Sequence, residues 1–207
     1  MNRVVMLFSG GYDSTLSTIL MAERGNVELH GLTINYSGRP RGEVRAARQL
    51  AKRLPFRSYN LMQLELPISL YGKDSNGVRT TAPSGAIPYR NLMFWSLAAF
   101  FAARIRAGSI AAGHTRSDAD DYSDASNTFF QLFGRISAFN GVNASSNPVK
   151  IVLPLRSTDP KEYAKLASKA EALLSLTWSC WHDNAKPCGE CYSCKQRARY
   201  LESLRVM

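Results

Sequence analysis

An apolar segment that runs directly into a glycine-containing turn and then a helix constrains this fold more than any other sequence feature. Residues 3–8 form a nearly continuous apolar run, residues 9–15 read Ser-Gly-Gly-Tyr-Asp-Ser-Thr, and residues 14–24 have a helical pattern that ends at Gly25. Unbroken apolar strands are typical of parallel sheets that are buried on both faces. The start of the chain therefore predicts a strand–turn–helix unit of a parallel α/β fold.

Strand and helix patterns alternate along the rest of the chain. Further strands are expected at 27–35, 56–61, 109–113 and 150–153, and further helices at 43–54, 90–106, 127–139 and 161–174. Gly, Pro, Asn, Ser or acidic residues dominate 67–88, 117–126 and 140–148, which predicts loops there. This order favours a doubly wound, mostly parallel sheet, with a ligand site at the carboxyl ends of its strands.

The turn at residues 9–15 has the chemistry of a phosphate site. Gly10 and Gly11 allow close approach of the backbone, and the N–H groups at the start of the following helix favour an anion. Ser9, Ser14 and Thr15 add hydroxyl groups, whereas Asp13 fits an anion site only if a cation such as Mg²⁺ bridges it to the ligand. No Gly-Lys-Ser/Thr follows, so this is not a Walker A loop. A tight turn capped by Ser and Asp is the alternative.

The four cysteines, all within one short C-terminal segment, predict a metal site. Two overlapping Cys-x-x-Cys steps join Cys188, Cys191 and Cys194, and Cys180 lies seven residues before the first of them. Four thiolates complete the tetrahedral coordination of Zn²⁺, so we expect a structural zinc knuckle. An iron–sulfur cluster, or His182 as a ligand, is the alternative.

Composition limits the remaining possibilities. The 207 residues suit one domain with a small appendage, which we place at 1–174 and 175–207. The longest apolar run is too short for a bilayer span and no signal peptide is recognisable, so we expect a cytoplasmic protein. The net charge is +10, and Arg41, Arg45, Arg48 and Lys52 have helical spacing. We interpret them as a solvated helix face, with a polyanion such as RNA as the alternative partner.

The whole set of motifs resembles the 7-cyano-7-deazaguanine synthase family of N-type ATP pyrophosphatases. The Ser-Gly-Gly-x-Asp-Ser loop is shared by the wider superfamily, and later motifs in matching order narrow the choice. They are Tyr36, Arg39 and Glu43; Pro88, Arg90 and Asn91; Asp118, Tyr122 and Asp124; Pro154, Leu155 and Lys161; and the cysteine knuckle.

The resemblance implies an ATP-dependent ligase with ATP, Mg²⁺ and Zn²⁺ as cofactors. That family activates 7-carboxy-7-deazaguanine as an acyl-adenylate, converts it to an amide with ammonia, and dehydrates the amide to a nitrile. By motif, residues 9–11 and 13–15 and Tyr36 bind the nucleotide, and Asp13, Arg90 and Lys161 are catalytic. Asn91, Asp118, Tyr122 and Asp124 bind the deazaguanine. The resemblance also implies a homodimer.

Three other functions stay open from the sequence. A diverged relative in a bacterial antiviral system would couple the activated acid to another amine, such as a protein terminus. A tRNA-modifying pyrophosphatase would use the basic stripe, although nucleic acid is an unlikely partner on the whole pattern. A non-catalytic subunit would bind the nucleotide without turnover.

Overall fold

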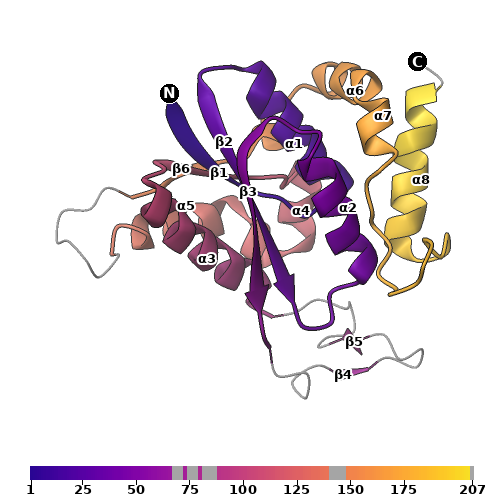
Figure 1. Cartoon of the computed structure of the whole chain (residues 1–207), viewed down its shortest axis with the longest axis horizontal. Helices are drawn as coiled ribbons and strands as arrows, with labels where there is room; N and C mark the ends of the chain where they lie inside the picture. The colour runs from indigo at the N-terminus through magenta and orange to yellow at the C-terminus, as the bar shows by residue number, and fades with distance from the viewer. Residues whose placement is uncertain (67–71, 74–78, 81–87, 140–147, 206–207) are drawn as a thin grey trace.

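The central element of the computed structural model, which describes residues 1–66, 72–73, 79–80, 88–139 and 148–205, is a five-stranded parallel sheet (Figure 1). Its strand order is β3-β2-β1-β6-β7, and every pair of neighbours is parallel. The strands are β1 (Asn2–Leu7), β2 (Val27–Tyr36), β3 (Phe56–Leu64), β6 (Ser109–Ala112) and β7 (Lys150–Val152). A separate antiparallel pair, β4 (Gly72–Lys73) and β5 (Arg79–Thr80), lies within the predicted loop 67–88.

Helices cover both faces of this sheet, as the doubly wound prediction requires. Helices α1 (Tyr12–Glu23) and α2 (Arg41–Ala51) lie on one face, and α3 (Arg90–Ile105) and α5 (Asn127–Ile136) lie on the other. The remaining helices are α4 (Arg116–Asp121), α6 (Pro160–Lys169), α7 (Glu171–Leu174) and α8 (Tyr192–Arg205), with 3-10 turns η2 at Ser123–Ala125 and η3 at Pro154–Arg156. The predicted fold class is therefore confirmed.

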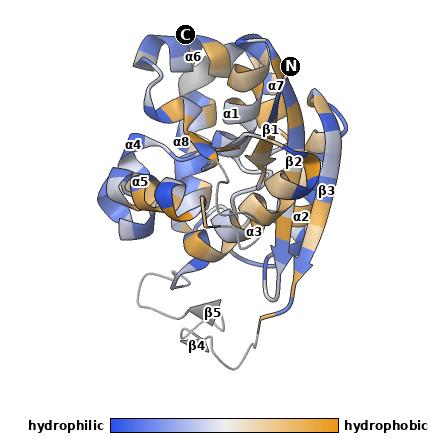
Figure 2. Ribbon diagram, turned by 90° about the vertical axis from the view of Figure 1, so that its left-hand side faces the viewer, coloured by the Kyte–Doolittle hydropathy of each residue, from blue (hydrophilic) through white to orange (hydrophobic). Residues whose placement is uncertain are grey.

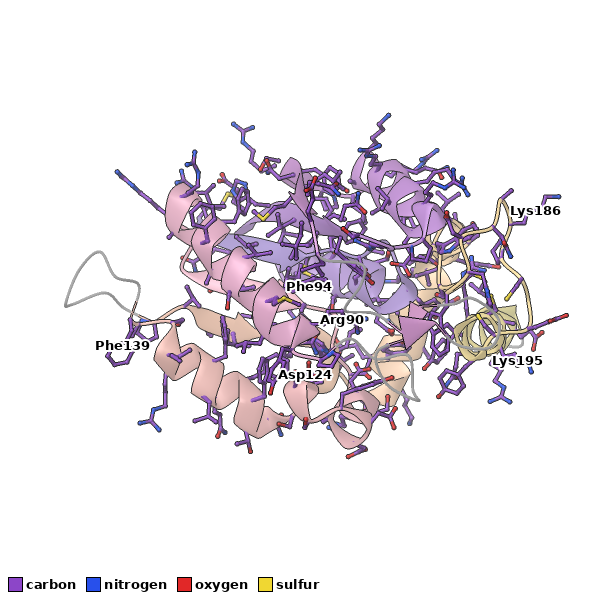
Figure 3. All side chains as sticks on the ribbon, turned by 90° about the horizontal axis from the view of Figure 1, so that it is seen from below. Arg90, Phe94, Asp124, Phe139, Lys186 and Lys195 are labelled. Atoms are coloured by element: carbon purple, nitrogen blue, oxygen red, sulfur yellow. The ribbon has the colours of Figure 1, made fainter. Side chains whose placement is uncertain are left out.

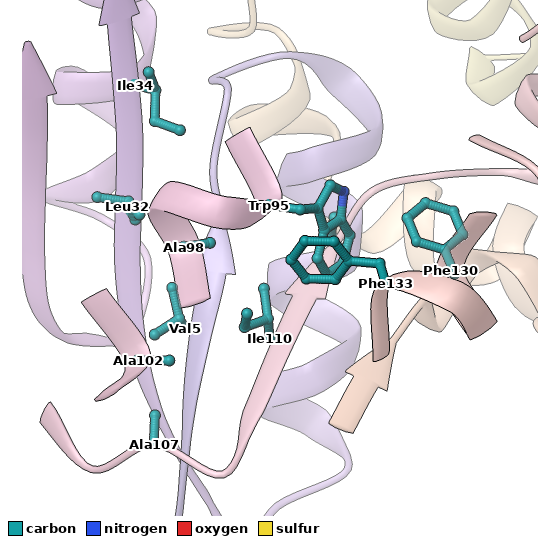
Figure 4. Packing of buried hydrophobic residues seen from close by; sticks show 11 residues of the cluster. Val5, Leu32, Ile34, Trp95, Ala98, Ala102, Ala107, Ile110, Phe130 and Phe133 are labelled. Atoms are coloured by element: carbon teal, nitrogen blue, oxygen red, sulfur yellow. The ribbon is translucent and has the colours of Figure 1, made fainter. Parts of the chain in front are cut away.

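The core between the sheet and α3 is built around a buried tryptophan. Trp95 packs edge-on against Phe130 and Phe133 of α5, with ring centroids 5.0 and 5.8 Å away, and Val5 and Ile110 of the sheet complete the cluster (Figure 4). In Figure 2 the central strands and α3 carry the hydrophobic colours. Because the strands are apolar on both faces, the opposite face needs its own cover of helices.

That second face is covered by α1 and α2, and α1 in turn carries the C-terminal helices. Met21 of α1 and Leu50 of α2 pack on Val4, Met6 and Phe8 of the first strand and the residue that follows it. On its other side α1 contacts a cluster from η3, α6 and α7, and Figure 1 shows α6, α7 and α8 grouped beside α1 and α2. The C-terminal segment is thereby held close to the end of β1.

Two predicted elements differ from the structure. Segment 117–126 is not a loop but contains most of α4 and all of η2, because Thr115 and Asp118 form a capping box that starts a helix (N–H of Thr115 to Oδ2, 2.6 Å). The expected helix 161–174 is split at Ala170 into α6 and α7. No glycine or proline marks that break, so packing against α1 decides it rather than local propensity.

The basic stripe is exposed to solvent, as predicted, and two of its arginines also contact the cysteine-containing segment. Arg41 forms an ion pair with Asp183 (2.9 Å), and the guanidinium of Arg45 lies 5.4 Å from the centroid of the Trp178 ring. The solvated face of α2 is therefore confirmed, and Arg41 and Arg45 remain exposed while they contact this segment. The proposed boundary between residues 174 and 175 stays a prediction, as does a homodimer. No helix in the described parts of the chain is long and apolar enough to cross a membrane.

Candidate active site

A cleft of about 500 Å³ opens at the carboxyl ends of β1 and β6, where the strand order reverses direction. The turn after β1, the end of β2, the first turn of α3, segment 113–122 and the C-terminal segment all contribute to it. The predicted site residues that line this cleft are Ser9, Gly11, Asp13, Ser14, Tyr36, Arg90, Asn91, Asp118 and Tyr122. Because these residues come from four separated stretches of sequence, the fold alone brings them together.

The turn after β1 is closed by its own hydroxyl groups. The Ser9 hydroxyl accepts from the N–H of Gly11 (3.2 Å) and lies 3.0 Å from that of Ser14, which also lies within hydrogen-bonding distance of the Gly11 carbonyl (3.1 Å). Gly10 has a φ of +80°, and a Cβ there would lie 2.5 Å from the backbone nitrogen of Ala47 in α2. Since α1 begins at Tyr12, the N–H groups of its first turn have no partner within the helix.

A buried arginine from the chain after β2 supports this turn. The Arg39 side chain is only 4% exposed and donates to the carbonyls of Ser9 and Ile34, both at 2.6 Å. Its charge is balanced by Glu43 at 2.8 Å. A buried guanidinium with its partners in place is costly to remove, so Arg39 fixes the turn relative to β2. The sequence motif included Arg39 and Glu43, but it did not indicate which part of the structure they contact.

Asp13 lies on the first turn of α1 and faces a second acidic side chain across the cleft. Burial, and then the nearby charge of Asp118, raise the pKa of Asp13 to about 7. The hydroxyl of Tyr163 in α6 donates to Oδ1 of Asp13 at 3.3 Å. Two carboxylates in one cleft, beside N–H groups that have no partner within α1, fit the chemistry of a magnesium–phosphate site.

Two further predicted residues that line the cleft, Arg90 and Asn91, lie in the first turn of α3, and Figure 3 marks Arg90 on this helix. Arg90 is hydrogen-bonded to the hydroxyl of Tyr36, whose ring lies 5.5 Å from that of Phe94. The amide of Asn91 donates to the carbonyl of Asp124 (3.1 Å) and to its Oδ1 (3.3 Å), and the backbone N–H of Asn91 approaches Oδ2 at 3.4 Å. Asp124 therefore caps the start of α3.

The segment after β6 is held in place by its own side chains and by Arg156. Oδ2 of Asp118 accepts from both the N–H and the hydroxyl of Thr115, at 2.6 and 3.0 Å. Arg156 donates to the carbonyls of Thr115 and Ala125, at 3.1 and 2.7 Å. Burial lowers the pKa of His114 to about 4, so its ring is neutral near pH 7. Tyr122 is left with 41% of its surface exposed on this segment.

Four predicted residues do not line the cleft within the described structure. Gly10 contributes backbone only, and the Thr15 side chain is fully buried and donates to the carbonyl of Gly11 (2.8 Å). Asp124 is occupied by Asn91, as described above. Lys161 is exposed on α6, where its backbone N–H is capped by Asp159 (2.8 Å), and Tyr163 is the residue of that helix that reaches Asp13.

One wall of the cleft was not recognised in the sequence. Trp181, Tyr192, Gln196 and Tyr200 line it from the cysteine-containing segment and α8. The last three are spaced by four residues, so they share one face of the helix. That spacing is a detectable signal, but nothing local indicates that this face meets the turn after β1. The ring of Tyr200 stacks on Tyr12 beside Asp13, with centroids 5.0 Å apart.

The four cysteines converge as predicted. Their sulfur atoms all lie within 4.8 Å of one another, and those of Cys188 and Cys194 are 3.9 Å apart. Sulfur atoms around a tetrahedral Zn²⁺ are separated by about 3.8 Å. Backbone N–H groups point at the sulfur atoms of Cys180 and Cys188, as a thiolate–metal site requires (each 3.4 Å). The cluster fits a metal with four sulfur ligands, and His182 contributes its backbone rather than its ring.

Solved structures with the same fold come from enzymes of nucleic acid modification. A U34-tRNA thiolase from Methanococcus maripaludis aligns with 98% of this chain and 65% of its own, at a TM-score of 0.53 and 17% identity. A predicted subunit of a tRNA methyltransferase from Methanocaldococcus jannaschii covers 81% of this chain and 75% of its own (TM-score 0.52, 21% identity). At such low identity the likeness concerns the fold alone.

Sequence relatives are more specific. A 7-cyano-7-deazaguanine synthase from Prochlorococcus marinus (strain AS9601) is 32% identical over 94% of this chain and 91% of its own length. One from Acetivibrio thermocellus is 31% identical over 100% and 96%. The family described as queuosine biosynthesis protein QueC matches residues 3–205. The chain therefore belongs to the QueC family.

Proposed function

We propose that this chain is an ATP-dependent ligase that adenylates 7-carboxy-7-deazaguanine and converts it with ammonia to 7-cyano-7-deazaguanine. The observation that carries the proposal is the meeting of Asp13, the free N–H groups of α1 and Asp118 in one cleft. Relatives that align along nearly the whole chain are named for this product. The carboxylate of the acid attacks the α-phosphorus of ATP, and pyrophosphate leaves.

Different residues of this chain have different roles at the phosphates. Ser9, Gly11, Ser14 and the first turn of α1 bind the leaving pyrophosphate. Asp13 and Asp118 would hold Mg²⁺, which would supply positive charge to offset that of the phosphates. Arg90, at the mouth of the same cleft, offsets charge on the phosphates, and Tyr36 is placed by Arg90 and Phe94 to contact the nucleotide.

Substrate-dependent release of pyrophosphate tests this proposal. Zinc-loaded protein with Mg²⁺ and ATP should release pyrophosphate only when 7-carboxy-7-deazaguanine is added, and Asp13→Asn should lower that rate at least about a hundredfold. Mass spectrometry of the product then distinguishes the nitrile from the amide. Pyrophosphate release that does not respond to the acid would refute the proposal.

Lys161 needs a separate test because its side chain is exposed on α6 outside the described cleft. The family motif places a catalytic lysine in this region, so its role stays a prediction. A Lys161→Ala variant that releases pyrophosphate at the parent rate would remove it from the catalytic set. Arg90→Ala is the matched variant, because the positively charged side chain of Arg90 does line the cleft. Its rate of pyrophosphate release should be strongly reduced.

A further inference from the structure

Two aromatic side chains of the C-terminal segment are exposed although they line a cleft. Trp181 is 46% exposed and Tyr192 is 61% exposed, and their ring centroids are 6.2 Å apart with an interplanar angle of 31°. Both line the same cleft as the phosphate-binding turn. Aromatic faces left open in a ligand cleft are suited to stacking on a flat ring system.

The next turn of α8 adds a polar group that is already oriented. The amide nitrogen of Gln196 donates to the hydroxyl of Tyr192 at 2.6 Å. This contact uses one of the hydrogen-bonding positions of the amide and leaves both a donor and an acceptor. A lactam edge of the guanine type presents a carbonyl oxygen beside an N–H group, which pairs with a carboxamide through two parallel hydrogen bonds.

The residues that the family motif assigns to the deazaguanine are less available for this task. Both carboxylate oxygens of Asp124 face Asn91, and the amide nitrogen of Asn91 is used by Asp124 in return. Asp118 has one oxygen engaged by Thr115 and faces Asp13. Tyr122 lines the cleft, but a single phenol hydroxyl cannot form the two parallel hydrogen bonds that a lactam edge offers.

We propose that Trp181, Tyr192 and Gln196 form the subsite for the second substrate, a planar bicyclic acid with a lactam edge. The ring system stacks on the aromatic pair, and Gln196 hydrogen-bonds to the lactam. This assignment rests on the proposed function and adds the surface that recognises the acid. Because Tyr192 lies between Cys191 and Cys194, the metal site fixes the position of the stacking ring.

Equilibrium binding separates this subsite from the nucleotide site. Calorimetry would measure the Kd of 7-carboxy-7-deazaguanine on zinc-loaded protein with Mg²⁺ and α,β-methylene-ATP, an analogue that blocks adenylation. Gln196→Leu and Tyr192→Ala should each weaken binding of the acid about tenfold or more. The Kd of the ATP analogue should stay unchanged in both variants.

Lys195→Ala is the matched control on the same helix, since Lys195 is exposed and does not line the described cleft. Figure 3 places it at the outer margin, away from Arg90 and Asp124. Tyr192→Phe keeps the ring and serves if Tyr192→Ala loses zinc; it should weaken binding less than Gln196→Leu. Parent-like affinity in Gln196→Leu and Tyr192→Phe, with normal zinc content, would overturn the subsite alone. Failure of the parent to bind the acid would overturn the proposed function and the subsite with it.

Discussion

Asp13 is the residue at which function and stability oppose each other. In the proposed function its carboxylate acts beside the phosphates, yet burial and the charge of Asp118 make the ionised form unfavourable in the ligand-free fold. A bound cation relieves this repulsion, so the ligand-free protein carries an electrostatic cost that the loaded protein avoids.

The pH dependence of unfolding should reveal this cost. The folded pKa of Asp13 is raised to about 7 from an ordinary value of 3.8, so the folded state holds this proton more tightly than the unfolded state. The contribution of Asp13 to stability therefore falls as pH rises from about 4 to about 7 and stays low above pH 7. Ligand-free Asp13→Asn should exceed the parent by about 1–3 kcal/mol at pH 8, and by much less at pH 5. Urea unfolding at both pH values measures the difference; a gap that does not change with pH would contradict the assignment.

Tyr163 is expected to orient Asp13 for the cation. Tyr163→Phe removes the hydroxyl that donates to Oδ1 but keeps the ring beside Tyr12. The loss of this donor disfavours the charged carboxylate, so the Mg²⁺ concentration for half-maximal pyrophosphate release should rise about tenfold. Tyr59→Phe is the control, because it loses a similar contact with Thr33 (3.0 Å) away from the cleft. Equal Mg²⁺ dependence in the two variants would show that the Tyr163 hydroxyl does not act on the metal site.

At the scale of elements, the cysteine-containing segment packs against the start of α2. Trp178 packs on Gly42, donates from its ring nitrogen to the carbonyl of Cys180 (3.0 Å), and lies under Arg45. The backbone N–H of Trp178 also donates to the carbonyl of Gly10 at 3.2 Å. One tryptophan thus joins α2, the cysteine cluster and the phosphate-binding turn.

A methyl group at Gly42 should break this junction. An added Cβ would lie 2.2 Å from the Trp178 ring, so Gly42→Ala forces the ring to move and should destabilise the protein by about 1–3 kcal/mol. Thermal unfolding and zinc content are the measurements. Gly134→Ala in α5 is the matched control, because its nearest neighbour is 3.8 Å away and alanine favours a helix. Gly134→Ala should be neutral or slightly stabilising; a parent-like Gly42→Ala would mean that Trp178 has room to shift.

At the scale of the whole molecule, the metal site and the phosphate-binding turn belong to one connected body. The cysteine-containing segment leads into α8, α8 packs on α6 and α7, and Tyr200 stacks on Tyr12 at the start of α1. Arg197 strengthens this link by donating to Thr177 (3.1 Å) and to the carbonyl of Ser175 (2.8 Å). Loss of the metal should therefore also destabilise residues outside the C-terminal segment.

Removal of zinc tests this coupling. A chelator, or Cys191→Ala, should lower the Tm and speed hydrogen exchange in residues 175–205, because zinc binding contributes to folding free energy. Exchange in residues 9–15 should also rise, through Trp178 and Tyr200. The chelator should have little further effect on Cys191→Ala. Melting like the parent would refute a structural metal site, and unchanged exchange at 9–15 would refute the coupling.

The sequence by itself determined those features whose information is local. Apolar runs bounded by glycine or proline gave the strands to within a few residues, and their alternation with helices indicated the parallel sheet and the location of its ligand edge. The cysteine cluster was predictable for the same reason, since all four ligands lie in one short segment. The turn at residues 9–15 could be predicted as a phosphate site because its glycines, hydroxyls and carboxylate are contiguous, and that role stays a prediction.

Only the tertiary structure decided which distant side chains meet. Arg39 reaches a carbonyl 30 residues away, and Tyr163 reaches a carboxylate 150 residues away. Periodicity tells which face of a helix is apolar but not which element that face will meet. For this reason the sequence did not reveal that Tyr163 contacts Asp13, or that Arg41 and Arg45 contact the cysteine-containing segment. The aromatic residues of α8 line the cleft only because α6, α7 and α8 pack on α1.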